Sequence, residues 1–328
     1  MKNVLLTGGA GFLGSNLVNN FFSLVEDNVT LTVLDRLDYS TKDLNISPKI
    51  KKDHRYKLIQ GDLCDNYLIK FILEEYQIDT VIHLAAQTHV DISFGNSLQF
   101  THDNILGTHT LLEECRKYGK IQRFIHFSTD EVYGEVTYEE TSPCTEKSLL
   151  MPTNPYSATK AAAEMLVRSY GCSYKLPYII IRANNIYGPR QFPDKLIPKF
   201  ILLLYQNKKL PIQGNGSAKR TFVHVLDIVK AIFIVITKGE IGEIYNIGSK
   251  NEFSVMEITK ELCRLMDKDF GKSVKYVKDR NFQDRRYLID YSKTSQLGWQ
   301  EEIIFDQGLK DTLKWYLKNI DKYLKLNI

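Results

Sequence analysis

The chain has 328 residues, of which 43% are hydrophobic and 25% are charged. These proportions are typical of a folded globular protein and exclude a disordered, collagen-like or fibrous chain. The formal net charge of +4 is close to balance, which argues against a dedicated nucleic-acid-binding protein but permits a local basic patch for a small anion.

No segment is predicted to enter a membrane. The longest apolar runs, Phe200–Tyr205 and Ala231–Ile236, are much shorter than the roughly 18–20 residues that a span requires. The apolar run near the N-terminus is three residues long and ends in glycines, so we expect no secretion signal. The 5 cysteines are odd in number and include no CxxC pair, which favours reduced thiols in a cytoplasmic protein and disfavours a zinc site.

The first half of the chain alternates short apolar runs, typical of buried strands, with segments of helical apolar spacing. The expected strands are Val4–Thr7, Leu31–Leu34, Tyr56–Gln60, Thr80–Leu84, Arg123–Ser128 and Tyr178–Arg182. The expected helices are Leu13–Leu24, Asn66–Tyr76, Phe100–Tyr118 and Ala158–Tyr170. This alternation predicts an α/β fold with a doubly wound parallel sheet of the Rossmann type, whose ligands bind at the carboxyl ends of the strands.

The second half predicts a smaller lobe that is interleaved in sequence with the sheet. Loops rich in Asn, Gly and Pro are expected at Ala183–Pro193 and Pro211–Ser217. A helix at Val225–Thr237 and a strand at Ile244–Ile247 then return to the sheet, and a C-terminal helix is expected at Gln307–Tyr323. We therefore expect a sheet domain of residues 1–183 plus 222–248 and a C-terminal substrate lobe of residues 184–221 plus 249–328.

A glycine-rich turn, Gly8–Gly14, lies between the first expected strand and the first expected helix. It satisfies GxGxxG from Gly9 and GxxGxxG from Gly8. Glycine permits a sharp turn and lets a pyrophosphate approach the helix N-terminus, where unpaired N–H groups favour anions. In this strand–turn–helix context the run predicts a dinucleotide site. The alternative is a tight turn without a ligand.

Residues at the ends of the next strands fit the rest of a dinucleotide. Asp35 favours a ribose 2′-hydroxyl, hence NAD over NADP, unless the neighbouring Arg36 holds a 2′-phosphate. The alternative for Asp35 is a solvated loop acid. Asp62 could bind the adenine amine or cap the following helix. Ala85 and Ala86 leave room for a cofactor, although small residues also pack well.

Tyr156 and Lys160 are expected on one face of a helix, one turn apart. A nearby ammonium would stabilise the phenolate and lower the pKa of Tyr156, so that the phenol could act as a base near neutral pH. Lys160 could also hold the ribose of the nicotinamide. The alternative is a surface pair without a chemical role.

The run Ser128–Glu131 follows the fifth expected strand, at the edge where a ligand crevice should lie. The adjacent carboxylates of Asp130 and Glu131 can divide acid and base roles if their surroundings separate their pKa values. The same residues also fit the start of a short helical turn. The nearby Tyr–Lys pair favours the catalytic interpretation.

Cations of the second lobe could bind a diphosphate, because arginine donates paired hydrogen bonds to phosphate oxygens. The candidates are Lys195, Arg220 and Arg280, and the alternative for each is a solvated surface charge. His89 and His224 have no metal-ligand spacing, so ordinary packing and no metal are expected for them.

These motifs resemble the extended short-chain dehydrogenase/reductase family over essentially the whole chain, and within it the nucleotide-sugar 4,6-dehydratases. The segments that carry the resemblance are Gly8–Gly14, His83–Asp91, Ser128–Gly134, Asn154–Lys160, Arg182–Arg190, Phe192–Pro198 and Asp279–Tyr287. The Thr129–Glu131 triplet is the specific part, because the related 4-epimerases lack the Asp–Glu pair.

The resemblance implies a lyase of deoxysugar biosynthesis with NAD as cofactor. Its reaction would oxidise C4 of a nucleoside-diphosphate glucose, eliminate water across C5–C6 and return hydride to C6, with UDP-glucose slightly favoured over dTDP-glucose. Tyr156 would take the proton of the 4-hydroxyl, and Thr129 would hydrogen-bond that oxygen. Glu131 would remove the C5 proton while Asp130 protonates the leaving 6-hydroxyl.

The resemblance also implies two groups of site residues. Those expected to bind NAD are Gly8, Gly11, Phe12, Leu13, Gly14, Asp35, Asp62, Leu63, Leu84, Ala85, Ala86, Tyr156 and Lys160. Those expected to bind the nucleotide sugar are His89, Thr129, Asn185, Lys195, Leu196, Gln213, Arg220, Asp279 and Arg280. A homodimer through helices in Leu98–Leu112 and Ala161–Tyr170 is implied too, although core burial would equally explain their apolar faces.

Two rival functions stay open at this point. A UDP-sugar 4-epimerase would use Tyr156 and NAD but neither Asp130 nor Glu131. A non-catalytic NAD-binding scaffold is the other, because a fold does not fix a function. A scaffold, however, has no need of a Tyr–Lys pair and an Asp–Glu pair.

Overall fold

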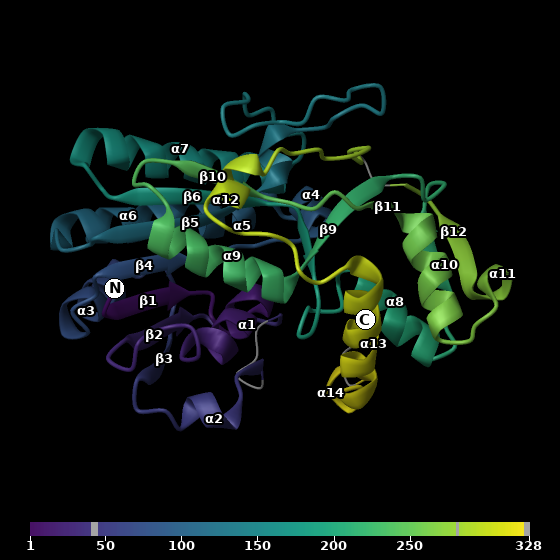
Figure 1. Ribbon diagram of the computed structural model, residues 1–328, viewed down its shortest axis with the longest axis horizontal. Coiled ribbons are helices and arrows are strands. Elements are labelled where there is room, and N and C mark those ends of the chain that lie inside the picture. Colours follow the sequence, from purple (N-terminus) through teal and green to yellow (C-terminus); the bar gives the residue numbers. More distant parts are fainter. Residues whose placement is uncertain (41–44, 280–281, 325–328) are drawn as a thin grey trace.

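The computed structural model describes residues 1–40, 45–279 and 282–324, and its centre is a seven-stranded parallel sheet (Figure 1). The strand order is β10-β6-β5-β4-β1-β2-β3. The strands are β1 (Asn3–Thr7), β2 (Thr30–Asp35), β3 (Tyr56–Gln60), β4 (Thr80–His83), β5 (Arg123–Thr129), β6 (Tyr178–Ala183) and β10 (Ile244–Ile247). Because the order of winding reverses between β1 and β4, the fold places its ligand crevice at the carboxyl ends of those strands.

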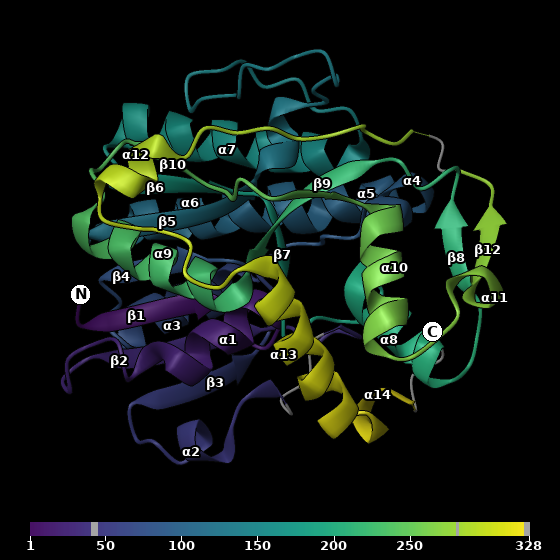
Figure 2. The same cartoon turned by 45° about the vertical axis from the view of Figure 1, so that its right-hand side comes forward.

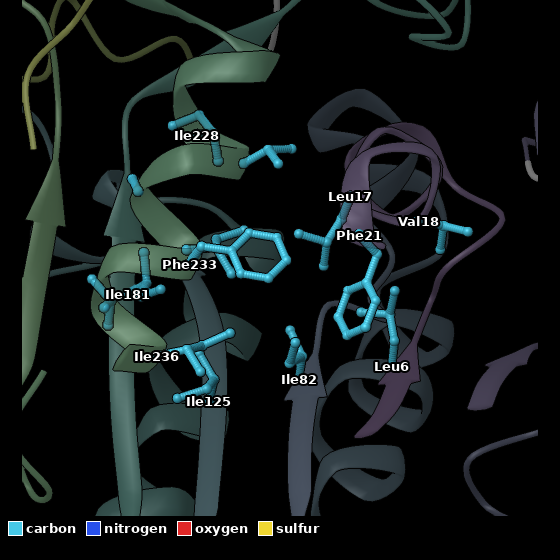
Figure 3. Packing of buried hydrophobic residues seen from close by; sticks show 14 of the residues in the cluster. Leu6, Leu17, Val18, Phe21, Ile82, Ile125, Ile181, Ile228, Phe233 and Ile236 are labelled. Carbon is cyan, nitrogen blue, oxygen red and sulfur yellow. The ribbon is translucent and has the colours of Figure 1, made fainter. Parts of the chain in front are cut away.

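Helices cover both faces of this sheet. The helices on one face are α1 (Phe12–Phe21) and α9 (Val225–Lys238), and those on the other are α3 (Asn66–Glu75), α6 (Gly107–Tyr118) and α7 (Pro155–Tyr174). Since strand side chains alternate, Val4 and Leu6 belong to the first core and Leu5 to the second. Figure 3 shows the first core, where the rings of Phe21 and Phe233 lie 5.6 Å apart. The predicted doubly wound sheet is confirmed.

A second body lies beside the sheet and has a hydrophobic core of its own (Figure 2). Its helices are α8 (Leu196–Tyr205), α10 (Val255–Leu265), α11 (Phe270–Ser273), α13 (Phe305–Lys318) and α14 (Asp321–Leu324), and its paired strands are β8 (Leu210–Gln213) with β12 (Val274–Val277). A three-stranded sheet links the two bodies, formed by β7 (Asn185–Tyr187), β9 (Lys219–His224) and β11 (Glu252–Ser254). Phe200, Leu262 and Tyr316 are buried in this second core.

Short helices complete the described chain. They are α2 (Pro48–Lys51), α4 (Val90–Gly95), α5 (Ser97–Phe100), the π-helix η2 (Thr101–Leu106), the 3₁₀ helix η3 (Asp130–Tyr133) and α12 (Ser292–Gln296). Within the described ranges, no helix combines the length and the apolar character needed to cross a lipid bilayer.

Four expectations about the elements were wrong. The single helix expected at Phe100–Tyr118 is interrupted by η2, because apolar spacing does not reveal the wider π turn. The C-terminal helix ends at Lys318, and α14 is separate. The loop expected at Ala183–Pro193 contains β7, whose backbone pairs with β9, and β8 runs into the loop expected at Pro211–Ser217.

Candidate active site

A cavity of about 490 Å³ opens at the carboxyl ends of the strands and reaches into the second body. The predicted site residues that line it are Gly8, Gly11, Phe12, Leu13, Gly14, Asp35, Asp62, Leu63, Leu84, Ala85, Ala86, His89, Thr129, Asp130, Glu131, Tyr156, Lys160, Asn185, Lys195, Leu196, Gln213 and Arg220. Asp279 does not: it is exposed and lies beside Gly214, where an added Cβ would come within 2.5 Å of the Asp279 carboxylate. Arg280 lies outside the described residues.

The glycine turn is shaped by close backbone contacts. Gly8 has φ +73°, and a Cβ there would lie 2.7 Å from Ala85 Cα. A Cβ on Gly14 would lie 2.1 Å from the Gly8 carbonyl oxygen. α1 then begins after Gly11 without a side-chain cap, so its first N–H groups remain available beside the cavity. This arrangement fits a pyrophosphate, and hence the dinucleotide that the sequence predicts.

The acids at the next strand ends have specific partners. Asp35 is buried, and its carboxylate accepts hydrogen bonds from the backbone N–H groups of Ala10 and Leu37, both at 2.8 Å, so the alternative of a solvated loop acid is wrong. Asp62 accepts from the Cys64 backbone N–H at 2.8 Å. Asp65, not Asp62, caps α3, which removes the capping alternative for Asp62.

Tyr156 and Lys160 are both buried in the first turns of α7, so the alternative of a surface pair is wrong. Lys160 Nζ donates to the Phe127 carbonyl oxygen at 2.7 Å, and burial lowers the pKa of Lys160 to about 8. The expected lowering of the Tyr156 pKa is also wrong for this structure. Burial raises the pKa of the phenol, and the neighbouring Glu131 carboxylate raises it further, because both disfavour a buried phenolate.

The two neighbouring acids occupy a short helical turn that faces the cavity. Thr129 caps this turn, η3, by accepting from the Glu131 backbone N–H at 3.3 Å, so the helical-turn interpretation is confirmed. Both acids also line the cavity, so the turn does not exclude a role in the site. Burial and the charge of Glu131 raise the pKa of Asp130 to about 7. Burial also raises the pKa of Glu131, whereas Arg220 opposes that shift. Near neutral pH, Asp130 can therefore carry a proton.

Side chains of the second body complete the cavity wall. Arg220 Nη1 donates to the Asp284 carbonyl oxygen at 2.9 Å, and its guanidinium lies 4.8 Å from the centroid of the Tyr287 ring. Lys195 Nζ donates to the Thr88 carbonyl oxygen at 2.8 Å. The interpretation of Lys195 and Arg220 as fully solvated surface charges is therefore wrong.

Several cavity residues were not predicted from the residues alone. Asn184 Nδ2 donates to Asp130 Oδ2 at 2.5 Å, across 54 positions of sequence, so no local spacing could have indicated this contact. Asn154 caps α7 and donates to Glu131 Oε2 at 3.3 Å; the Asn–Pro pair before the helix is a capping signal that could have identified it. His89 Nε2 lies 3.8 Å from Asp194 Oδ2. In the described part of the chain, no group of His, Cys, Asp and Glu could hold a metal ion.

A parallel sheet with a glycine turn into α1, and a buried Tyr–Lys pair at the same edge, defines the extended short-chain dehydrogenases/reductases. Residues 5–312 match the family described as GDP-mannose 4,6 dehydratase, and the chain belongs to that family.

Relatives with curated names agree with this membership. The chain is 48% identical over 318 residues to a trifunctional UDP-glucose 4,6-dehydratase/UDP-4-keto-6-deoxy-D-glucose 3,5-epimerase/UDP-4-keto-L-rhamnose-reductase of Arabidopsis thaliana, covering 97% of this chain and 47% of that protein. It is 44% identical to the dTDP-D-glucose 4,6-dehydratase of Mus musculus, covering 98% and 90%. The chain thus spans about half the length of the plant relatives that it matches.

A solved structure agrees in fold. The dTDP-glucose 4,6-dehydratase DesIV of Streptomyces venezuelae, crystallised with NAD and TYD bound, superposes with a TM-score of 0.93 at 37% identity, over 98% of each chain.

Proposed function

We propose that the protein is an NAD-dependent lyase that dehydrates a nucleoside-diphosphate glucose to its 4-keto-6-deoxy derivative. One observation carries the proposal: the acid pair Asp130 and Glu131 lines the same cavity as Tyr156 and Lys160. An epimerase needs the second pair only. A scaffold would have no reason to bury Asp130, Tyr156 and Lys160 and half-bury Glu131 around one cavity, since removal of each group from water is costly.

The cofactor that fits this cavity is NAD, which reversibly accepts a hydride when bound. The uncapped first turn of α1 suits its diphosphate, and Asp35 suits a ribose hydroxyl. Buried Ser128 Oγ has no hydrogen-bond partner among the described residues, and Ser128 lines the cavity, as expected of a group that awaits a ligand.

The protein's own residues would divide the proton transfers. Tyr156 would take the proton of the sugar 4-hydroxyl and pass it to solvent, because this oxygen stays a ketone in the product, while Thr129 hydrogen-bonds the same oxygen. Glu131 would remove the C5 proton, which a 4-ketone acidifies. Asp130, whose pKa of about 7 leaves it partly protonated near neutral pH, would deliver its proton to the leaving 6-hydroxyl. Elimination of water needs a base and an acid together, and these two side chains supply one of each.

The sugar nucleotide would bind between the two bodies. Lys195 and Arg220 supply positive charge for the diphosphate, and buried Asn185 Oδ1 lacks a partner within the described residues. We favour UDP-glucose slightly over dTDP-glucose, because the plant relative's name includes UDP-glucose. The two bases differ by one methyl group, which typically changes affinity by only about 1–3 kcal/mol.

We also propose the organisation around this chemistry. Residues 1–183 plus 222–248 would bind NAD, and residues 184–221 plus 249–328 would bind the substrate. A homodimer would form through Leu98–Leu112 and Ala161–Tyr170, a proposal supported by the exposure of Leu98 (82%) and Met165 (43%). Cytoplasmic residence is supported by the 5 cysteines, all unpaired.

A paired turnover assay on UDP-glucose and dTDP-glucose tests the proposal, with the product identified by proton NMR. A dehydratase yields a 6-methyl doublet. Conversion to a UDP-sugar epimer without that doublet would replace our proposal with the epimerase. Absence of any turnover, with NAD bound, would favour the scaffold.

A further inference from the structure

Arg36 directly follows Asp35 at the end of β2, a position from which an arginine can bind the 2′-phosphate of NADP. Its guanidinium is instead held by three carboxylates. Nη2 donates to Asp103 Oδ2 at 2.8 Å and to Asp38 Oδ2 at 3.0 Å. Nη1 donates to Asp103 Oδ1 and to Asp62 Oδ2, both at 3.2 Å. Three negative charges therefore surround one positive charge at the cavity wall.

Asp103 is the best anchored of the three carboxylates. Its side chain is 9% exposed, against 32% for Asp38 and 38% for Asp62, and it alone binds both terminal nitrogens of Arg36. It also accepts from Gln87 Nε2 at 2.9 Å and from Gln99 Nε2 at 2.8 Å. The pair of parallel Arg–carboxylate bonds is the strong form of this interaction, so Arg36 is fixed mainly by Asp103.

The π-helix η2 (Thr101–Leu106) sets the position of Asp103. The next residue, Asn104, is buried; it donates to Thr159 Oγ1 at 2.9 Å and accepts from the Gln87 backbone N–H at 2.7 Å. Asn104 thus holds η2 against α7 and against the loop that follows β4, while Asp103 faces the cavity from the same turn. A π turn at a ligand cavity is a common functional device, since it redirects side chains without ending the helix.

We propose that Asp103 determines cofactor specificity: by holding Arg36 it excludes a 2′-phosphate and selects NAD over NADP. This inference rests on the proposed function, because it assumes that the cavity binds a dinucleotide. To bind NADP, Arg36 would have to leave a bidentate partner. The phosphate would also enter the field of Asp38, Asp62 and Asp103, where like charges repel.

The test replaces Asp103 by Asn, which keeps the shape but removes the charge, and by Ser, so that the result does not depend on the folding of one variant. Dissociation constants of NAD⁺ and NADP⁺ are measured by titration calorimetry on the full chain. We expect NADP⁺ affinity to rise about tenfold or more, with NAD⁺ affinity changed by less than about threefold. Asp27→Asn makes the same charge change at the opposite end of β2, where the carboxylate is exposed, and should change neither constant.

A double variant identifies the cause. The expected gain in NADP⁺ affinity depends on the Arg36 guanidinium that the Asp103 variants release. Adding Arg36→Ala to Asp103→Asn should therefore abolish this gain. The inference would be overturned if the parent protein binds NAD⁺ and both Asp103 variants keep the parent's ratio of NADP⁺ to NAD⁺ affinity. That result would leave the proposed function intact. A parent protein that binds neither dinucleotide would overturn the proposed function itself.

Discussion

At the residue scale, the environments of Asp130 and Glu131 decide what each can do. Asp130 has the amide of Asn184 and the hydroxyl of Thr129 as partners, yet burial and the Glu131 charge raise its pKa to about 7. An acid of this strength is protonated on the acidic side of neutrality and can still release its proton. Glu131 faces Arg220, whose positive charge favours the ionised form that a base requires.

Replacing Glu131 by Gln should abolish dehydration, because the amide keeps the shape but cannot accept the C5 proton. We expect formation of the 4-keto-6-deoxy product to fall by about 10²–10⁴-fold, the usual contribution of a general base. Oxidation at C4 should persist, since Tyr156 and Lys160 are unchanged, and NADH absorbance should accumulate in single-turnover experiments.

The matched control for this variant is Glu135→Gln, four residues further along the chain and beyond the end of η3. Glu135 accepts from the Arg285 backbone N–H at 2.8 Å and is not among the described residues that line the cavity, so its removal should leave turnover near that of the parent. Product formation by Glu131→Gln within tenfold of the parent rate would refute the role given to Glu131.

Asn184 should shift the pKa of Asp130 through its hydrogen bond to that carboxylate. The amide donates to Asp130 Oδ2 and favours the ionised carboxylate, so it lowers the pKa of Asp130 relative to a site without it. The proposed reaction needs the protonated form, and kcat should therefore fall as the pH rises through about 7. In Asn184→Leu the pKa of Asp130 rises, and this limb of the kcat–pH profile should move to higher pH. A uniform loss of kcat with an unmoved limb would mean that Asn184 has a structural role only.

At the element scale, Asn154 links the stability of a helix to the site. It caps α7 in a reciprocal capping box with Ser157 and also donates to Glu131. Asn154→Ala should lower the free energy of unfolding by about 1 kcal/mol through loss of the cap. Asn154→Ser should stay within a few tenths of a kcal/mol of the parent, because serine is also a good cap. Both variants lose the amide donor to Glu131.

Urea unfolding of the parent and the two Asn154 variants separates these effects. If turnover depends on the hydrogen bond from the Asn154 amide to Glu131, both variants should lose turnover, while only the Ala variant should lose stability. Normal turnover by Asn154→Ser would show that the contact with Glu131 is dispensable.

Central strands such as β1 and β6 were predictable from sequence because strands buried on both faces appear as continuous apolar runs. The two edge strands β3 and β10 were predicted to the residue, although β3 is only partly buried. The π turn in η2 was not, since apolar residues at helical spacing continue through it. The short strand β7 was not predicted either, because a three-residue strand that pairs with distant β9 has no periodicity to detect.

The cofactor half of the cavity was predictable for a related reason. In a parallel sheet, every residue just after a strand reaches the same edge, so adjacency to a strand end was sufficient for Asp35, Asp62 and Ala85. Contacts between distant segments were not predictable: Asn184 reaches Asp130, and Asp103 reaches Arg36, by the folding of separate elements. The burial that raises the Tyr156 pKa was likewise invisible in a Tyr–Lys spacing.

At the scale of the whole molecule, two buried histidines in the middle of the sheet couple folding to pH. His83 contacts Thr7 Oγ1 at 2.7 Å and Thr108 Oγ1 at 2.9 Å. His126, 5.4 Å away between ring centroids, is fully buried, and neither of its ring nitrogens has a partner in the described structure. Burial and the nearby Lys160 lower the pKa of His83 to about 3 and that of His126 well below its usual value.

Both rings are therefore neutral in the folded protein, whereas the unfolded chain takes up protons below about pH 6.5. Their contribution to stability is fully present above that pH and is lost progressively as the pH falls below it. Each histidine contributes a slope of about 1.4 kcal/mol per pH unit once the unfolded form is protonated.

His126→Leu removes one of these histidines and a pair of unpartnered polar atoms. We expect its free energy of unfolding, relative to the parent, to increase by about 1.4 kcal/mol for each pH unit below about 6.5, as measured by urea unfolding at a series of pH values. His54→Gln is the matched control: its side chain is 93% exposed, so folding does not desolvate the ring, and its profile should follow that of the parent. Parallel stability profiles for His126→Leu and the parent below that pH would show that His126 becomes protonated without unfolding.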